Sequence, residues 1–166
     1  MGHAGWHPRP RPPLGRRGPG GTRSQAIGPA RSGLSTKVVA LCDALGNLLR
    51  FTLLPGQRHD SQGVAPLLDA LAADGFVPGA LLADRAFDLD DLRDALAVRG
   101  IRAVIPPRRN RRNQYPYDRP LYAARHLVEN LFAKLKAWRG IATRHDKTDQ
   151  SFAAALHLVG AVINAR

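Results

Sequence analysis

The sequence is poor in cysteine, in acidic residues and in long apolar runs, and each shortage excludes a class of protein. The single cysteine, Cys42, rules out an internal disulfide and a zinc cluster built from cysteines, so we expect a small buried apolar side chain there. No apolar stretch approaches the roughly 18 residues needed to span a bilayer. The basic N-terminus lacks the apolar core of a secretory signal. These shortages favour a bacterial, cytoplasmic protein that is not embedded in a membrane.

Acidic residues are outnumbered throughout the chain. The 166 residues include 25 Lys and Arg but 13 Asp and Glu, which gives a formal net charge of +12. Such an excess indicates a polyanionic partner, with nucleic acid the first candidate and an anionic membrane surface the second. The apolar share of 44% and the length suit one globular domain with a sizeable core.

The first 21 residues are mostly glycine, proline and arginine and show no hydrophobic period. We expect a flexible tail there, because such a stretch cannot bury enough apolar surface to order itself. Residues 1–37 contain seven Lys and Arg and no acid. The tail either binds phosphates nonspecifically or is a sequence never selected to fold, such as one translated after a frameshift.

The rest of the chain alternates between strand-like and helix-like patterns. An opening antiparallel hairpin followed by a strand-helix-strand-helix-strand run predicts an α/β fold, with a mixed sheet flanked by helices. The expected strands are 34–44, 48–55, 80–84 and 101–107. The expected helices are 61–74, 88–99, 121–139 and 151–165, with an arginine-rich polar loop over 108–119.

The expected helix over 121–139 carries two distinct faces. One face is broad and apolar, and the other gathers Tyr122, Arg125, Glu129 and Lys136 within roughly 60° of each other at about 100° per residue. Glu129 is the only glutamate in the sequence. One interpretation is a solvated surface with one ion pair between residues four apart. The other is a site that uses the carboxylate.

Asp84 is the second candidate carboxylate, at the predicted end of a buried strand, where open α/β sheets tend to place their sites. A turn or cap aspartate is the simpler interpretation of the same position. Together, Asp84 and Glu129 could hold Mg²⁺ or Mn²⁺, which prefer oxygen ligands and activate water or a 3′-hydroxyl for attack on a phosphodiester. Nearby arginines and lysines would stabilise the anionic transition state.

Tyr122, Arg125, Glu129 and Lys136 match, position for position, the Y-x2-R-x3-E-x6-K signature of bacterial insertion-sequence transposases of the DDE type. The flanking stretches resemble that family in the same order, from about residue 21 to the C-terminus. They are SQAIGPARSGLSTK, DALGN, PGQRHD, ADRAFD, IPPRRNRR and RHLVENLFAKLKAWRGIATRHDK.

The resemblance implies an RNase H-like catalytic domain over 22–166, with the element order β-β-β-α-β-α-β-α. It implies cleavage and strand transfer at insertion-sequence ends, with Asp84 and Glu129 as the second and third acidic metal ligands. Its implied partners are transposon inverted-repeat ends and target DNA at the nucleoid, with the chain self-associated or bound to full-length transposase. The implied DNA-contacting residues are Tyr122, Arg125, Lys136, Arg108, Arg109, Arg111 and Arg112.

The sequence departs from the family at its first catalytic aspartate, since no acid precedes Asp43, which lies in the predicted hairpin turn. We therefore expect an N-terminally truncated domain whose first strand is missing or non-native, inactive on its own. Asp60 is the one carboxylate that could substitute, although a position near a helix N-terminus explains it more simply. Two alternatives stay open: a non-catalytic DNA-binding remnant or inhibitor of full-length transposase, and a product that aggregates because an unpaired strand edge is exposed.

Overall fold

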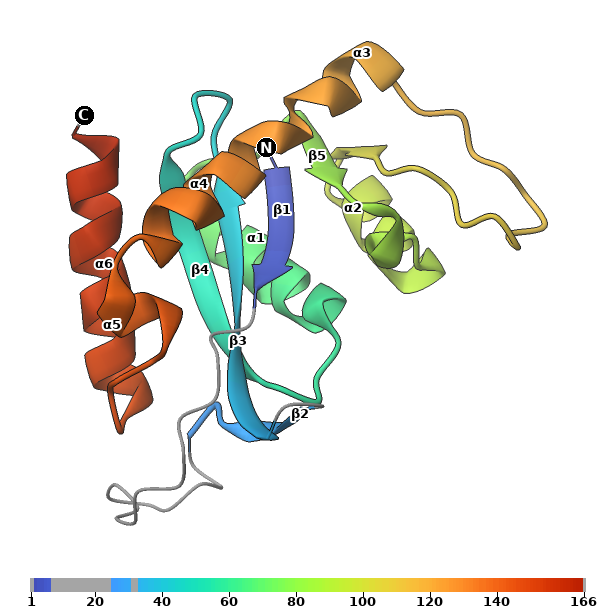
Figure 1. The fold of residues 1–166 in the computed structure, drawn as a ribbon. Helices are drawn as coiled ribbons and strands as arrows, with labels where there is room; N and C mark the ends of the chain where they lie inside the picture. The colour runs from blue at the N-terminus through green and yellow to red at the C-terminus, as the bar shows by residue number, and fades with distance from the viewer. Residues whose placement is uncertain (1, 7–24, 31–32, 166) are drawn as a thin grey trace.

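A computed structural model describes residues 2–6, 25–30 and 33–165 of the chain (Figure 1). Its centre is a sheet of six strands. The strands are β1 (Gly2–Trp6), β2 (Gly28–Ala30), β3 (Gly33–Cys42), β4 (Leu48–Pro55), β5 (Ala80–Ala83) and β6 (Arg102–Val104). The longer helices are α1 (Val64–Ala73), α2 (Asp90–Val98), α4 (His126–Lys136) and α6 (Asp149–Asn164). The short ones are η2 (Asp60–Gly63), η3 (Arg85–Phe87), α3 (Arg119–Tyr122), η4 (Ala123–Arg125) and α5 (Arg139–Ala142).

The strands β4, β3, β1, β5 and β6 lie side by side in that order. β3 is antiparallel to both β4 and β1, whereas β1, β5 and β6 run in parallel. β2 pairs with the beginning of β3. With β2 left aside, the element order is β-β-β-α-β-α-β-α. The predicted mixed α/β fold of the RNase H-like type is confirmed.

The structure differs from the sequence-based expectation in the first strand. The sequence predicts a flexible tail over residues 1–21, but Gly2–Trp6 form β1 between β3 and β5. Without it, the facing edges of β3 and β5 would present unpaired N–H and C=O groups. Five residues free of proline can pair with these edges through their backbone alone. The remainder of the predicted tail, and its suggested phosphate binding, lie outside the described residues.

Helices cover both faces of the sheet (Figure 1). Successive residues of β3 point to opposite faces, and apolar side chains on both faces need to be covered. Val38, Ala40 and Cys42 face α4, α5 and α6, and Val39 and Leu41 face α1 and α2. Cys42 has no exposed surface, as predicted for a small buried side chain. No described helix is long and apolar enough to cross a membrane.

The expected helix over 121–139 is divided into three successive segments, α3, η4 and α4. α4 ends at Lys136, and the chain then turns into α5. Trp138 lies within the expected helix, but its backbone is extended at the start of α5 and it is 45% exposed. The predicted end of the second helix is correct, because Gly100, with a φ of 67°, follows α2 and reverses the chain toward β6.

Candidate active site

Asp84 directly follows β5, and its side chain lines a pocket of about 430 Å³. Its Oδ1 accepts a hydrogen bond from the Ala86 N–H at 2.7 Å and so caps η3. The simple interpretation of Asp84 as a cap residue therefore holds for one of its two carboxylate oxygens. The capped turn also fixes the carboxyl group at the wall of the pocket. The other lining residues are Arg85, Ala86, Pro106, Tyr117 and Tyr122.

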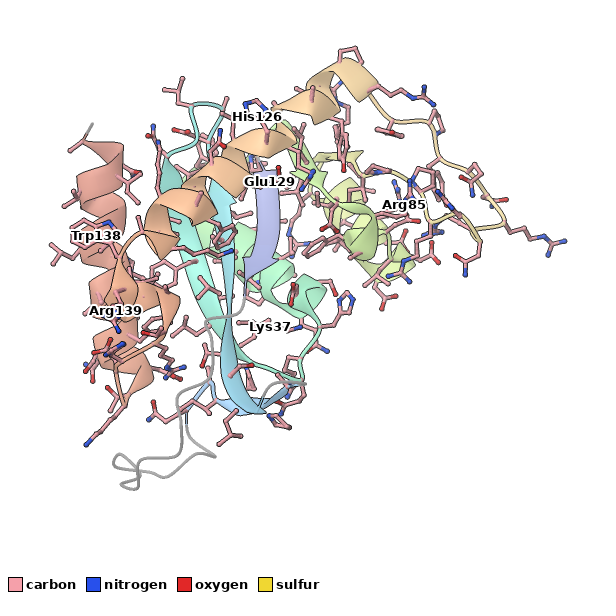
Figure 2. The ribbon with its side chains drawn as sticks, viewed as in Figure 1. Lys37, Arg85, His126, Glu129, Trp138 and Arg139 are labelled. Carbon is pink, nitrogen blue, oxygen red and sulfur yellow. The ribbon has the colours of Figure 1, made fainter. Side chains whose placement is uncertain are left out.

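The transposase-like signature brings three of its four side chains together, one each from α3, η4 and α4. Arg125 Nη2 lies 2.7 Å from Glu129 Oε1, so the predicted ion pair between residues four apart is present. The Arg125 guanidinium also lies 5.7 Å from the centre of the Tyr122 ring. Glu129 is 54% exposed and lies where α4 crosses β1 (Figure 2). Lys136 is exposed on the last turn of the same helix.

Arg125 lies in the field of both candidate carboxylates. Burial acts to lower the pKa of Arg125, but the hydrogen bond to Glu129 and the charges of Glu129 and Asp84 outweigh it and raise that pKa. Burial raises the pKa of Tyr122; Arg125 opposes this rise and the charge of Asp84 adds to it. Asp84, Arg125 and Glu129 therefore form one electrostatic unit. η4, which carries Arg125, packs against both β1 and β5.

This unit supplies only part of a divalent metal site. Two carboxylates are present, and the Arg125 guanidinium bonds one of them. Among the described residues, no group of three His, Cys, Asp or Glu side chains is placed to hold a metal ion. β1, which adjoins Asp84, contains no acidic residue. Asp60 does not fill the gap within the described residues, because its carboxylate is paired with Lys37 Nζ at 2.8 Å.

The four predicted DNA-contacting arginines of the 108–119 loop have different roles. Arg111 pairs with the buried carboxylate of Asp88 at 2.8 Å and with Asp90 at 2.6 Å. Arg108 donates its backbone N–H to Asp88 and its Nη2 to the Ala86 carbonyl. Arg109 and Arg112 are exposed to solvent. The pattern of the sequence alone could not separate these roles.

The sequence pattern indicates only a helix start at Asp88 and gives no sign of its contacts with the arginines. The structure places it before α2, with its carboxylate buried and bound to Arg93 at 2.7 Å. Two features could have revealed it: an arginine-rich loop whose one acid, Asp118, lies at its end, and an aspartate placed directly after the apolar Phe87. Arginine side chains that are largely removed from solvent need a carboxylate partner to balance their charge.

Comparison with known proteins identifies the family of the chain. Residues 12–164 match the family model described as the transposase DDE domain. The chain belongs to that family. It is 37% identical over 132 residues to a Brucella ovis protein named as a transposase for insertion sequence element IS6501, covering 78% of this chain and 98% of that protein. The family's role is DNA transposition, and its DDE domains act with divalent metal ions.

One solved structure is also similar to this transposase-family chain. It is the cryo-EM structure of a simian T-cell lymphotropic virus intasome in complex with PP2A regulatory subunit B56 gamma. The sequence identity is 20% and the TM-score is 0.47. The similarity covers 78% of this chain and 44% of the viral chain, so this chain spans less than half of that relative.

Proposed function

We propose that this chain binds DNA through the edge of the sheet formed by Asp84, Arg125 and Glu129, and that it does not cleave DNA on its own. The observation that carries the proposal is the Arg125–Glu129 ion pair, on which the charge of Asp84 also acts, together with the lack of an acid in the adjoining strand β1. The Arg125 guanidinium offsets one of the two negative charges, and its remaining donors can contact a phosphate. Two carboxylates hold Mg²⁺ or Mn²⁺ less well than three, because ligand charge sets affinity.

The register of β1 identifies the position that a third carboxylate would need. His3 pairs with Ala83 in the parallel ladder, so Ala4 is level with Asp84 one residue further along. In the antiparallel ladder, Ala4 pairs with Ala40, which packs in the cluster beneath α4. Directly paired residues share a face of the sheet. An aspartate introduced at position 4 would therefore stand beside Asp84, on the α4 side.

The first prediction concerns metal binding and nicking by an Ala4→Asp variant. We expect the unaltered chain to leave supercoiled plasmid intact in the presence of Mn²⁺ or Mg²⁺. Ala4→Asp should bind Mn²⁺ at least roughly tenfold more tightly by isothermal titration calorimetry, because a third carboxylate completes the site. It should also produce metal-dependent nicks.

Ala4→Asn is the matched control, because asparagine has the size of aspartate without its charge. Ala4→Asp combined with Glu129→Gln should lose the nicking. Robust cleavage by the unaltered chain, abolished by Glu129→Gln, would overturn the proposed inactivity. Equal Mn²⁺ affinity in Ala4→Asp and Ala4→Asn would show that Asp84 and Glu129 do not form the proposed site.

The second candidate is an inhibitor that occupies inverted-repeat ends or joins a complete transposase in mixed complexes at the nucleoid. The Arg125–Glu129 pair favours it, because a carboxylate held by a guanidinium leaves the surface neutral enough to approach DNA. Such binding needs no metal and weakens steeply with salt. The test is binding to an inverted-repeat duplex in EDTA. Binding that persists without metal supports the inhibitor, and binding that requires Mg²⁺ or Mn²⁺ contradicts it.

A further inference from the structure

The loop between β6 and α3, residues Pro106–Asp118, projects from the body of the molecule (Figure 1). We call it the arginine arm. It contains no helix or strand, and its four arginines are followed by a single acid at its last position. An irregular segment of this length ordinarily pays a large entropy cost on binding. This arm is instead held by side-chain contacts.

Asp88 is the main anchor of the arginine arm. Its side chain has no exposed surface. Oδ1 accepts a hydrogen bond from Arg93 Nε at 2.7 Å, and Oδ2 accepts from Arg111 Nε at 2.8 Å and from the Arg108 N–H at 2.7 Å. Both oxygens of a buried carboxylate are therefore satisfied, one from α2 and the other from the arm. A buried charge needs this kind of pairing to be tolerated.

Two further residues complete the anchor. The Tyr115 ring centre lies 4.6 Å from the Arg93 guanidinium and 5.1 Å from that of Arg111, which is within the range of cation–π attraction. Gln114 Nε2 donates to the carbonyls of Arg108 and Arg111. These bonds replace the backbone ladder that the loop lacks. The arm is thus preorganised, which lowers the cost of binding.

The contacts separate the arginines into anchors and free groups. In the part of the chain that the structure describes, the guanidinium groups of Arg109 and Arg112 make no ion pair or hydrogen bond, and both residues are exposed. The ends of the arm, at Pro106 and Tyr117, line the pocket beside Asp84. Two unneutralised guanidiniums therefore extend from the same region as the candidate site.

We propose that the arginine arm is a preformed binding element for the phosphate backbone of double-stranded DNA, with Arg109 and Arg112 as the phosphate contacts and Asp88 as the positioning residue. The proposal rests on the proposed function, because it takes DNA as the ligand. Guanidinium groups match phosphate oxygens in geometry and charge. Binding of single-stranded DNA would require unpaired bases to stack on an aromatic side chain. Tyr115 is disfavoured for this role, because its ring already contacts the guanidinium groups of Arg93 and Arg111.

The test measures binding of a fluorescent duplex of about 30 base pairs in EDTA, from roughly 50 to 200 mM KCl. Arg109→Gln combined with Arg112→Gln should reduce the slope of log K against log[salt] by about two, at roughly 0.9 per lost phosphate contact. Affinity should fall roughly tenfold or more. Arg50→Gln combined with Arg99→Gln removes the same charge on β4 and after α2, where the arginines pair with Asp74 and Asp69, and should leave the slope unchanged.

Two variants test the positioning role. Asp88→Asn should weaken binding, and Gln114→Ala, which alters no charge and leaves the buried carboxylate intact, should weaken it several-fold with an unchanged salt slope. A purely structural role for Gln114 would leave the affinity unchanged and so contradict the proposal. Equal slopes in the arm variant and the charge-matched control would also overturn it.

The outcomes separate this inference from the proposed function. If the unaltered chain fails to bind duplex DNA at all, both fail. If it binds but the arm variant behaves like the control, the proposed function stands and the arm proposal falls. Displacement of the duplex by polyglutamate as efficiently as by unlabelled duplex would identify an acidic protein as the partner and overturn the choice of DNA.

Discussion

Asp88 accepts three hydrogen bonds through its buried carboxylate, from Arg93, Arg108 and Arg111. Its ionisation is therefore linked to folding. Burial acts to raise the pKa of Asp88, but the Arg108 N–H and the side chains of Arg111 and Arg93 outweigh it and hold that pKa below its ordinary value. A carboxyl group with a lowered pKa in the folded state stabilises the fold when it is ionised. The contribution is complete above the unfolded value of about 3.9 and is lost as the pH falls through the folded value.

We predict that Asp88→Asn lowers the free energy of unfolding by about 2 kcal/mol at neutral pH, because its three charge-assisted hydrogen bonds are weakened or lost when one acceptor oxygen becomes an NH2 group. The difference from the unaltered protein should shrink as the pH falls from about 4, where the carboxyl of the unfolded chain begins to protonate, through the lower pKa of the folded state. Denaturant unfolding between about pH 2 and pH 7 measures this. A difference that stays constant over the acid range would show that ionised Asp88 is not the cause.

Residues with local signals were predictable, and those that depend on distant partners were not. The positions of Asp84 after a strand and of Glu129 on a helix follow from periodicity and turn chemistry within a few residues. The separate roles of Arg109 and Arg111 do not, because the partner of Arg111 is Asp88, 23 residues away. Metal binding and DNA contact by these residues remain predictions.

At the scale of elements, Arg144 joins the beginning of the β2–β3 hairpin to α6. It is buried, its φ is 42°, and its guanidinium donates to the Ala26 carbonyl, to Thr36 Oγ1 and to Asp149 Oδ1. The guanidinium also lies 5.0 Å from the centre of the Phe152 ring. The pattern of the sequence gives no indication of this role, because Arg144 lies in a short polar loop far from its partners. A left-handed backbone in a non-glycine residue persists only when its surroundings fix it.

We predict that Arg144→Ala lowers the free energy of unfolding by roughly 2–4 kcal/mol, because it removes one member of a buried network. Arg144→Lys should recover only part of the loss, since an ammonium group cannot donate in a fork to several acceptors. Arg144→Gly should be somewhat more stable than Arg144→Ala, because glycine adopts the positive φ without strain, although it lacks the network as well. Thermal melting of the three variants measures the order, and an unaffected Arg144→Ala would show that the network does not hold the hairpin.

At the scale of the whole molecule, the five side-by-side strands depend on β1 to join β3 to β5 and β6. The order of strands and helices was predictable, because apolar runs and helical periods are local signals. The identity of the central strand was not predictable. GHAGW has no strand pattern, and its pairing depends on the edges of β3 and β5.

We predict that His3→Pro lowers the melting temperature by roughly 6–12 °C, because proline removes a backbone donor in a strand that is paired on both sides and costs about 3 kcal/mol. His3→Ala is the control that separates the backbone from the side chain, and it should melt close to the unaltered protein. Both variants should show one cooperative transition. Identical melting of His3→Pro and His3→Ala would show that Gly2–Trp6 do not form the central strand.

β1 is held by backbone pairing with β3 and β5. The fold therefore tolerates substitutions in β1 that the chemistry of the site does not. A short stretch able to adopt strand geometry suffices for this pairing, whereas our proposal makes the nuclease centre depend on a single carboxylate at one register position. If the proposal holds, a domain of this kind keeps its shape and its binding to nucleic acid after it has lost its reaction. A single codon could restore that reaction.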